Sequence, residues 1–378
     1  MSPAAPDSEL PAVMRAAVLL GTGGPEMLEV RDDVGVPRPG PGDVLVQVSA
    51  CGMNNTDINT RVGWYSRAVT AATGSEGFSE ADPDDSGWGR SGLSFPRIQG
   101  ADIAGVVVSA GEGADVGLVG RRVLVDPWLR DRDRPHDREL AGYLGSERDG
   151  GYAEYCTVPG ENVYPVSVGL SDIELASFAC SWSTAEHMLQ RSGIGPGATV
   201  AVPGASGGVG SALVQLAKHH GARVVAVAGR SKLAAVRDLG ADAVVARESD
   251  DVVAAAVEVN GGCFDVVADI VGGDSFGGWL EGLNRGGCYV TSGAIAGPIV
   301  ELDLRTLYLN DLQLHGATVY EPQVFADLVG YIERGEVRPV VGGTYRLEEI
   351  RAAQEAFAAK RHVGSLVITV TAPGRDPV

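Results

Sequence analysis

The sequence predicts a two-domain α/β protein, in which a mostly β domain is joined to a parallel sheet flanked by helices. Short apolar or alternating runs bounded by Gly, Pro and Asp occupy 14–20, 44–49 and 103–109, as is typical of strands. After about residue 166 strands alternate with helices, which is typical of a parallel sheet with right-handed crossovers. A chain of 378 residues is long enough for both domains.

The composition excludes several classes of protein. The formal net charge of −19 disfavours nucleic acids and anionic membranes as partners, because both need a basic surface. No apolar run approaches the roughly 20 residues that span a bilayer, and the polar segment 1–11 resembles neither a signal peptide nor an anchor. The five cysteines include no C-x-x-C pair, which is typical of free thiols in a reducing compartment. We therefore expect a cytoplasmic protein.

The second domain is predicted from elements in regular alternation. Helices are expected at 171–189, 211–220 and 232–239, and strands at 198–202, 223–228, 243–246 and 264–270. The last sixty residues add two helices and a final strand, at 323–335, 347–359 and 365–370.

The sharpest motif joins the strand 198–202 to the helix 211–220. A glycine-rich turn separates them, and glycines let the backbone approach a pyrophosphate group. The free N–H groups of the helix N-terminus attract the same group. The sequence therefore predicts a dinucleotide site whose loop consists of Gly204, Ala205, Ser206, Gly207, Gly208, Val209 and Gly210.

The end of the strand 223–228 favours NADPH over NADH. An NAD site usually carries a carboxylate there, which binds the ribose hydroxyls. This chain has Gly229, Arg230, Ser231 and Lys232 instead. The two cations could neutralise a 2′-phosphate group, and the serine could donate a hydrogen bond to it. The alternative is that these residues are the solvated start of the next helix.

Together with four further motifs, these features resemble the medium-chain dehydrogenase/reductase superfamily, and most closely its zinc-free quinone oxidoreductase and enone reductase branch. The motifs are CGMNNTDINTR at 51–61, GADIAGVVVSAGEG at 100–113, GGYAEY at 150–155 and HVGSLVITV at 362–370. The resemblance implies a Rossmann domain over 166–315 and a GroES-like, mostly β catalytic domain over 1–165 that is completed by 316–378. It also implies an active site in the cleft between them, and pairing of Rossmann sheets in a homodimer or homotetramer.

The same resemblance bears on metal binding. Zinc alcohol dehydrogenases of this superfamily bind a catalytic metal through a Cys, a His-Glu pair and a further Cys. The corresponding positions here are Asn54, the pair Ala101-Asp102, and Cys180. One thiol and one carboxylate do not supply the three protein ligands of a catalytic zinc. The cysteines of the structural zinc lobe are missing as well, so we expect no metal site.

Without a metal, hydride transfer needs an acceptor that is already activated, such as an enone or a quinone. The carbonyl oxygen of that acceptor gains negative charge and needs hydrogen-bond donors. Two candidates are Asn54, at the position of the lost ligand, and Tyr65, in an R-x-G-x-Y element that resembles the zinc-free branch. Asn54 could equally be a helix N-cap, and Tyr65 could simply pack. Asn59 stands where the branch often has a tyrosine, which weakens a direct transfer of quinone specificity.

Further residues are expected beside the nicotinamide. Thr184 matches a family threonine near that ring, and its alternative role is a helix cap. Ser292 and Gly293 follow a strand at the carboxyl edge of the sheet, where nicotinamide usually lies. Asp57 and Arg61, at i and i+4 on one helix, are predicted to form a salt bridge.

One segment interrupts the β pattern. Residues 68–95 are rich in Gly, Ser, Asp and Glu, which is more typical of a solvated surface insertion than of a binding element. Because the segment directly follows Tyr65, a second hypothesis is that it covers the cleft and narrows the choice of substrate.

The leading functional prediction is an NADPH-dependent reductase of a small molecule, which delivers hydride to an activated C=C bond or a quinone. One alternative is a zinc-free alcohol dehydrogenase or carbonyl reductase, in which Asn54 and Tyr65 replace the metal. Another is an NADPH-binding protein without turnover that serves as a sensor or structural partner, because a fold alone does not establish catalysis.

Overall fold

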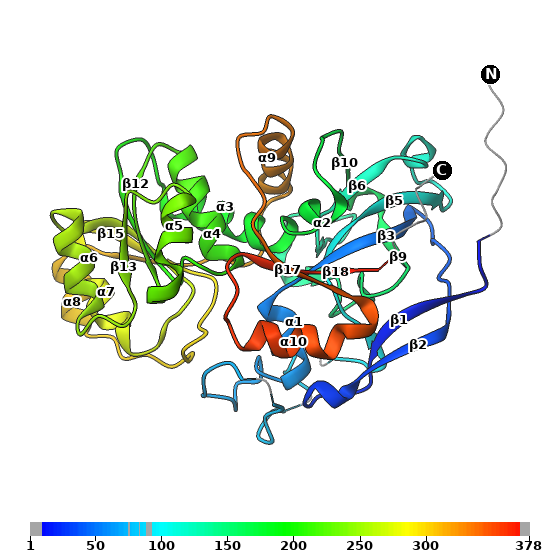
Figure 1. Cartoon of the computed structure of the whole chain (residues 1–378), viewed down its shortest axis with the longest axis horizontal. Helices are drawn as coiled ribbons and strands as arrows, with labels where there is room; N and C mark the ends of the chain where they lie inside the picture. Colours follow the sequence, from blue (N-terminus) through cyan, green and yellow to red (C-terminus); the bar gives the residue numbers. More distant parts are fainter. Residues whose placement is uncertain (1–9, 75, 83, 88–92, 371–378) are drawn as a thin grey trace.

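The chain forms two lobes in the computed structural model, which describes residues 10–74, 76–82, 84–87 and 93–370 (Figure 1). Most of the polar N-terminus and parts of the 68–95 segment lie outside these residues. One lobe carries a parallel sheet with its helices, and the other is mostly β. No helix of the described residues is long and apolar enough to cross a membrane.

The β lobe is organised around β3 (Asp43–Met53), which is buried along most of its length. Its main sheet follows the order β10-β6-β5-β3-β18-β17, and β9 pairs with β3 as well. These strands are β5 (Asp102–Ala110), β6 (Arg122–Val125), β9 (Tyr155–Pro159), β10 (Val163–Pro165), β17 (Val341–Arg346) and β18 (Ser365–Thr369). A second sheet has the order β2-β1-β4, from β1 (Val13–Leu19), β2 (Leu28–Gly35) and β4 (Arg97–Ile98). A two-stranded sheet joins β7 (Trp128–Leu129) to β8 (Gly142–Tyr143).

The other lobe contains a six-stranded parallel sheet of order β13-β12-β11-β14-β15-β16. Its strands are β11 (Thr199–Pro203), β12 (Arg223–Ala228), β13 (Ala243–Ala246), β14 (Phe264–Asp269), β15 (Leu283–Thr291) and β16 (Gln313–Gly316). Its helices are α3 (Ala179–Ser192), α4 (Gly208–His219), α5 (Leu233–Asp238), α6 (Val252–Asn260), α7 (Phe276–Glu281) and α8 (Leu304–Leu309). The order reverses between β11 and β14, which is the switch point of a doubly wound Rossmann sheet.

Alternation along each strand gives this sheet two apolar faces. Val200 and Val202 pack in one core with α3 and α4, whereas Ala201 packs in another with α6 and α7. Both faces are therefore covered by helices, as a parallel sheet requires.

The expected helix at 171–189 is two helices, α2 (Asp172–Leu175) and α3. Ser171 and Glu174 form a capping box at the start of α2. The break lies against Gly52 of β3, where a Cβ would stand 2.1 Å from the Ala176 carbonyl oxygen. The chain therefore turns where a glycine lets two backbones touch, which helical periodicity does not reveal.

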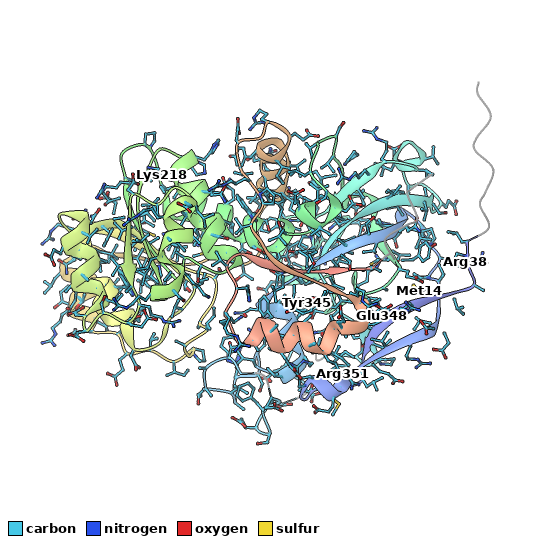
Figure 2. All side chains as sticks on the ribbon, viewed as in Figure 1. Met14, Arg38, Lys218, Tyr345, Glu348 and Arg351 are labelled. Carbon is cyan, nitrogen blue, oxygen red and sulfur yellow. The ribbon has the colours of Figure 1, made fainter. Side chains whose placement is uncertain are left out.

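The C-terminal part returns to the β lobe. Helix α9 (Pro322–Glu333) packs in the core of α3 and α4, and then β17 and β18 join the main β sheet. Helix α10 (Ile350–Ala358) follows β17 and crosses near α1 (Asn55–Val62) in Figure 1. Arg351 donates to the Leu28 carbonyl oxygen, and Glu348 pairs with Arg15 of β1. These contacts fix the returning segment to the β lobe, where Figure 2 labels Glu348 and Arg351.

Candidate active site

A cavity of about 360 Å³ lies at the carboxyl ends of β11 and β14, at the switch point of the sheet. Its walls come from the loop after β11, the turn after β12, the loop after β14 and the segment before β18. That segment is bound directly to the glycine loop, since the Gly364 N–H donates to the Ser206 carbonyl oxygen over 2.9 Å. The β lobe and the Rossmann lobe thus enclose one cleft.

The glycine loop has an inner row and a supporting row. Gly204, Ser206, Gly207, Gly208 and Val209 line the cavity. Ala205 and Gly210 lie behind them: Ala205 is fully buried, and a Cβ on Gly210 would stand 2.2 Å from the Gly204 carbonyl oxygen. Gly204 has φ +74°, a conformation that favours glycine. The loop is therefore close-packed from behind and open in front, at the N-terminus of α4.

The far end of the cavity is cationic. Gly229 and Lys232 line it, as does Arg247, which follows β13 and carries no sequence signal of its own. The pKa of Lys232 is lowered by burial and by Arg247. Arg230 and Ser231, by contrast, are exposed, because the short 3-10 turn that they begin directs Lys232 toward the cavity.

A carboxylate also reaches this region, from the turn that follows β13. Glu248 accepts a hydrogen bond from the Arg230 backbone N–H over 2.9 Å and pairs with Arg247 over 3.5 Å. Its carboxylate is therefore engaged by groups of the protein itself.

A smaller cavity of about 140 Å³ adjoins the first and shares five lining residues with it: Asn54, Asn55, Val209, Ile270 and Ile295. We call it the reaction pocket. Thr184, Ser292 and Gly293 line it, as do both predicted donors, Asn54 and Tyr65. Its remaining walls are largely aromatic or small and come from both lobes: Trp64, Trp128, Tyr143, Ala294, Ile295 and Ala317.

Asn54 is the N-cap residue of α1 and forms a capping box with Asp57. Its backbone N–H donates to the Asp57 carboxylate over 2.8 Å, and its side-chain Oδ1 also accepts from the Ser181 hydroxyl over 3.4 Å. The buried Nδ2 makes no hydrogen bond of ordinary geometry, although the amide lies near enough to Asp102 to lower that group's pKa. The side chain thus caps the helix and also lines both cavities.

Two tyrosine hydroxyls border the reaction pocket. Burial raises the pKa of Tyr65, while hydrogen bonds with Thr56 and Asn59 lower it in part. Burial also raises the pKa of Tyr143, which sequence analysis did not single out. Both phenols therefore stay protonated at neutral pH and keep an O–H that can donate.

Three of the four positions that correspond to the zinc-binding residues, Asn54, Asp102 and Cys180, lie together in a hydrogen-bonded cluster. The Cys180 N–H donates to the Asp102 carboxyl group over 2.8 Å, and the Cys180 thiol is near Tyr143 and Thr184. Burial raises the pKa of Asp102 to about 7. Within the described residues, no group of three or more His, Cys, Asp or Glu side chains is placed to hold a metal ion. The residues present do not fit a catalytic zinc ion.

Two acidic residues, Asp57 and Asp269, make hydrogen bonds behind the walls of the site. Asp57 accepts from Tyr152 over 2.9 Å, whereas Arg61 donates to Gln354 over 2.7 Å, so the expected pair finds separate partners. Asp269, at the end of β14, accepts from the N–H of Val271 over 2.7 Å and so holds the loop that lines the cleft. An acidic residue at the carboxyl end of a predicted parallel strand is the sequence signal that could have identified Asp269 as a site residue.

The beginning of the 68–95 segment takes part in the cleft. The Thr73 N–H donates to the Ile295 carbonyl oxygen over 3.1 Å, and the Trp64 indole donates to the Ala71 carbonyl oxygen over 3.0 Å. Thr73 also lines the reaction pocket. This part of the segment links the β lobe to the Rossmann lobe beside the pocket.

Comparison with known proteins agrees with this architecture. Residues 40–168 match the alcohol dehydrogenase GroES-like domain, and residues 208–334 match the zinc-binding dehydrogenase domain. An alcohol dehydrogenase from Geobacillus stearothermophilus is 30% identical over 354 residues, which are 90% of this chain and 95% of that protein. The chain belongs to the medium-chain dehydrogenase/reductase superfamily. It is therefore an oxidoreductase of this superfamily, whose members use a nicotinamide cofactor.

Other relatives carry different names. Mouse quinone oxidoreductase is 29% identical, with 91% of this chain and 93% of that protein covered. A structure from Sinorhizobium meliloti 1021, provisionally named an alcohol dehydrogenase, is 46% identical with a TM-score of 0.86, and 96% of this chain and 98% of that one are covered. These superfamily members thus have names that indicate more than one reaction.

Proposed function

We propose that this protein is an NADPH-dependent reductase of activated C=C bonds in enones or quinones, and that it works without zinc. The main observation behind the proposal is that the cofactor cavity and the reaction pocket adjoin in one cleft. A cavity with a cationic end meets a pocket lined by Asn54 and Cys180, which stand at two of the positions where zinc members of the superfamily bind the metal.

The proposed NADPH site uses the glycine loop for the pyrophosphate and the cationic end for the 2′-phosphate. Lys232 and Arg247 line the cavity beside Gly229 and supply positive charge that favours a phosphate group. Glu248 is occupied by Arg247 and by the Arg230 N–H. Thr184, Ser292 and Gly293 would border the nicotinamide ring, which supplies a hydride when it is bound in its reduced form.

The proposed catalytic residues are Asn54 and Tyr65. A carbonyl oxygen that gains negative charge is stabilised by fixed donors in a pocket that excludes water. The Asn54 amide is oriented by Ser181, and the buried Tyr65 phenol keeps its proton. Trp64 and Trp128 supply apolar surface for a conjugated substrate.

The test combines binding with turnover. Thermal shifts with NADPH and NADH are measured on protein dialysed against a chelator, and NADPH oxidation is then followed with a panel of enones and quinones. We expect a larger shift with NADPH, loss of that preference in Lys232→Met/Arg247→Met, and turnover of the panel. Equal shifts would contradict the cofactor assignment, and turnover that needs added zinc would contradict the metal-free mechanism. Binding without turnover would favour a sensor or structural role.

A second candidate is reduction of a saturated carbonyl or oxidation of an alcohol with the same donors. The names of the Geobacillus and Sinorhizobium relatives favour it. Product analysis separates the two candidates, since a saturated ketone indicates C=C reduction and an alcohol indicates C=O reduction.

We also propose that the protein is a homodimer or homotetramer that pairs through the β16 edge. Several large apolar side chains are exposed at α8 and beside it: Ile299, Leu304, Tyr308, Leu309 and Leu314. An apolar patch at an open sheet edge favours pairing with a second copy. Light scattering that gives the mass of a monomer would contradict this.

A further inference from the structure

A third cavity lies next to the reaction pocket, and the function proposed above assigns no ligand to it. It has a volume of about 390 Å³ and lies between α1, α10 and the start of the 68–95 segment. Its lining residues are Asn55, Ile58, Thr73, Gly74, Glu355, Ala358, Ala359 and Lys360. We call it the tail cavity. Asn55 and Thr73 line the reaction pocket too, so the two cavities adjoin at these residues.

The tail cavity contains a cation without an acidic partner. The Lys360 ammonium group donates to the Asn55 side-chain oxygen and lies 3.8 Å from the centroid of the Phe357 ring. In the part of the chain that the structure describes, no carboxylate forms an ion pair with it. The nearest charge that acts on it is another cation, Lys232, whose ammonium group donates to the Lys360 carbonyl oxygen. A half-buried ammonium group with only neutral partners is costly to maintain.

The backbone at Lys360 adds to this cost. Its φ of +51° is a left-handed conformation, which a lysine adopts at the expense of about 1 kcal/mol or more. Burial and the nearby Lys232 lower the pKa of Lys360 to about 7. A strained and desolvated cation in a cavity wall is typical of a ligand-binding position.

The other walls suit an aliphatic chain. Ile58, Ala358 and Ala359 present small or apolar side chains, and Gly74 presents none. Glu355 also lines the cavity; it is exposed, and its charge opposes the lowering of the Arg61 pKa by burial. The cavity thus combines an apolar wall with the Lys360 cation, and its carboxylate lies at the solvent-exposed side.

We propose that the tail cavity binds an anionic group, a carboxylate or a phosphate, at the end of a substrate chain whose activated C=C bond occupies the reaction pocket. The chain passes Asn55 and Thr73, and Lys360 binds the anion. This inference rests on the proposed reductase function. Lys360 also borders the cofactor cavity, so the experiment must separate the two ligands.

The test compares enones that differ only in their tails. One series ends in a methyl group, a second in a carboxylate and a third in a phosphate, each with several chain lengths. KM and kcat are measured at saturating NADPH for the wild type and for Lys360→Met, which keeps the length of the side chain and removes its charge. Arg361→Met is the matched control, because Arg361 is the exposed cation next in sequence. The Kd for NADPH is measured separately for each protein.

We expect the wild type to prefer one of the anionic series at an intermediate chain length. Lys360→Met should raise KM for that series by roughly 10-fold or more beyond any change in KM for the methyl series, as loss of a charge-assisted hydrogen bond predicts. Arg361→Met should change neither series. Equal effects of Lys360→Met on all series, or a weaker Kd for NADPH alone, would overturn the proposal in favour of a cofactor cation. Turnover of the methyl series without any anionic preference would refute the tail site and leave the reductase function standing, whereas no turnover of any series would refute that function itself.

Discussion

Two glycines of the cofactor loop are predicted to respond differently to the same substitution. A Cβ on Gly210 would stand 2.2 Å from the Gly204 carbonyl oxygen and 2.7 Å from the Ala205 Cα atom. Because both neighbours are backbone atoms, Gly210→Ala must push the loop away by about 1 Å to reach ordinary contact distance. Overpacking of this kind costs about 1–3 kcal/mol.

At Gly207 the nearest atom to a Cβ is 3.9 Å away, and φ is −80°, so alanine fits the free protein. Its methyl group would enter the cofactor cavity that Gly207 lines. We therefore expect Gly207→Ala to melt within about 3 °C of the wild type but to bind NADPH at least 10-fold more weakly.

Thermal melts with and without NADPH measure both effects. Gly210→Ala should melt several degrees lower without cofactor and should also show a reduced NADPH shift. If Gly207→Ala bound NADPH as tightly as the wild type does, the loop would not be the pyrophosphate site. If Gly210→Ala melted at the wild-type temperature, the close-packed description of the loop would be incorrect.

Three further predictions concern the reaction pocket, its buried acid and the exposed sheet edge. Asn54→Ala should lower kcat about 100-fold at saturating NADPH and saturating enone, because one fixed donor to the developing oxyanion is lost; an unchanged kcat would exclude that role. Burial raises the pKa of Asp102 to about 7, so its folded form holds a proton that the unfolded chain releases above about pH 4. This group therefore lowers stability progressively as pH rises from 4 to 7, and Asp102→Asn should melt higher than the wild type at pH 8 but not at pH 4.5; an equal difference at both values would contradict the shift. Leu304→Glu with Tyr308→Glu should halve the mass measured by light scattering, since two exposed apolar side chains of α8 become charged; an unchanged mass would exclude this edge.

The parts of the fold with local signals were predictable from the sequence. The strand 223–228 and the strand 243–246 coincide with β12 and β13, because each is a short apolar run between turn residues. The glycine loop was predictable for the same reason, since strand, turn and helix follow one another directly. The break between α2 and α3 was not, because it depends on Gly52 in a distant strand.

The residues of the site were predictable only where they fall within one continuous segment of the sequence. Three site residues, Arg247, Tyr143 and Lys360, come from parts of the chain that are far apart in sequence. None of them belongs to a motif that indicates its role. Arg230 was expected to face the cofactor because of its position after β12, but a single turn of 3-10 helix leaves it exposed and directs Lys232 inward. Spacing along the chain does not specify which side of such a turn faces a cavity.

The central claim is hydride delivery from NADPH to the carbon that is conjugated with a carbonyl group, without a metal. The most direct measurement uses NADPH that carries deuterium at its transferable position, chelator-dialysed protein and an α,β-unsaturated ketone, with the position of deuterium in the product determined by NMR. We expect a saturated ketone with deuterium on its β-carbon. Deuterium on the carbinol carbon of an alcohol, or transfer that appears only when zinc is restored, would contradict it.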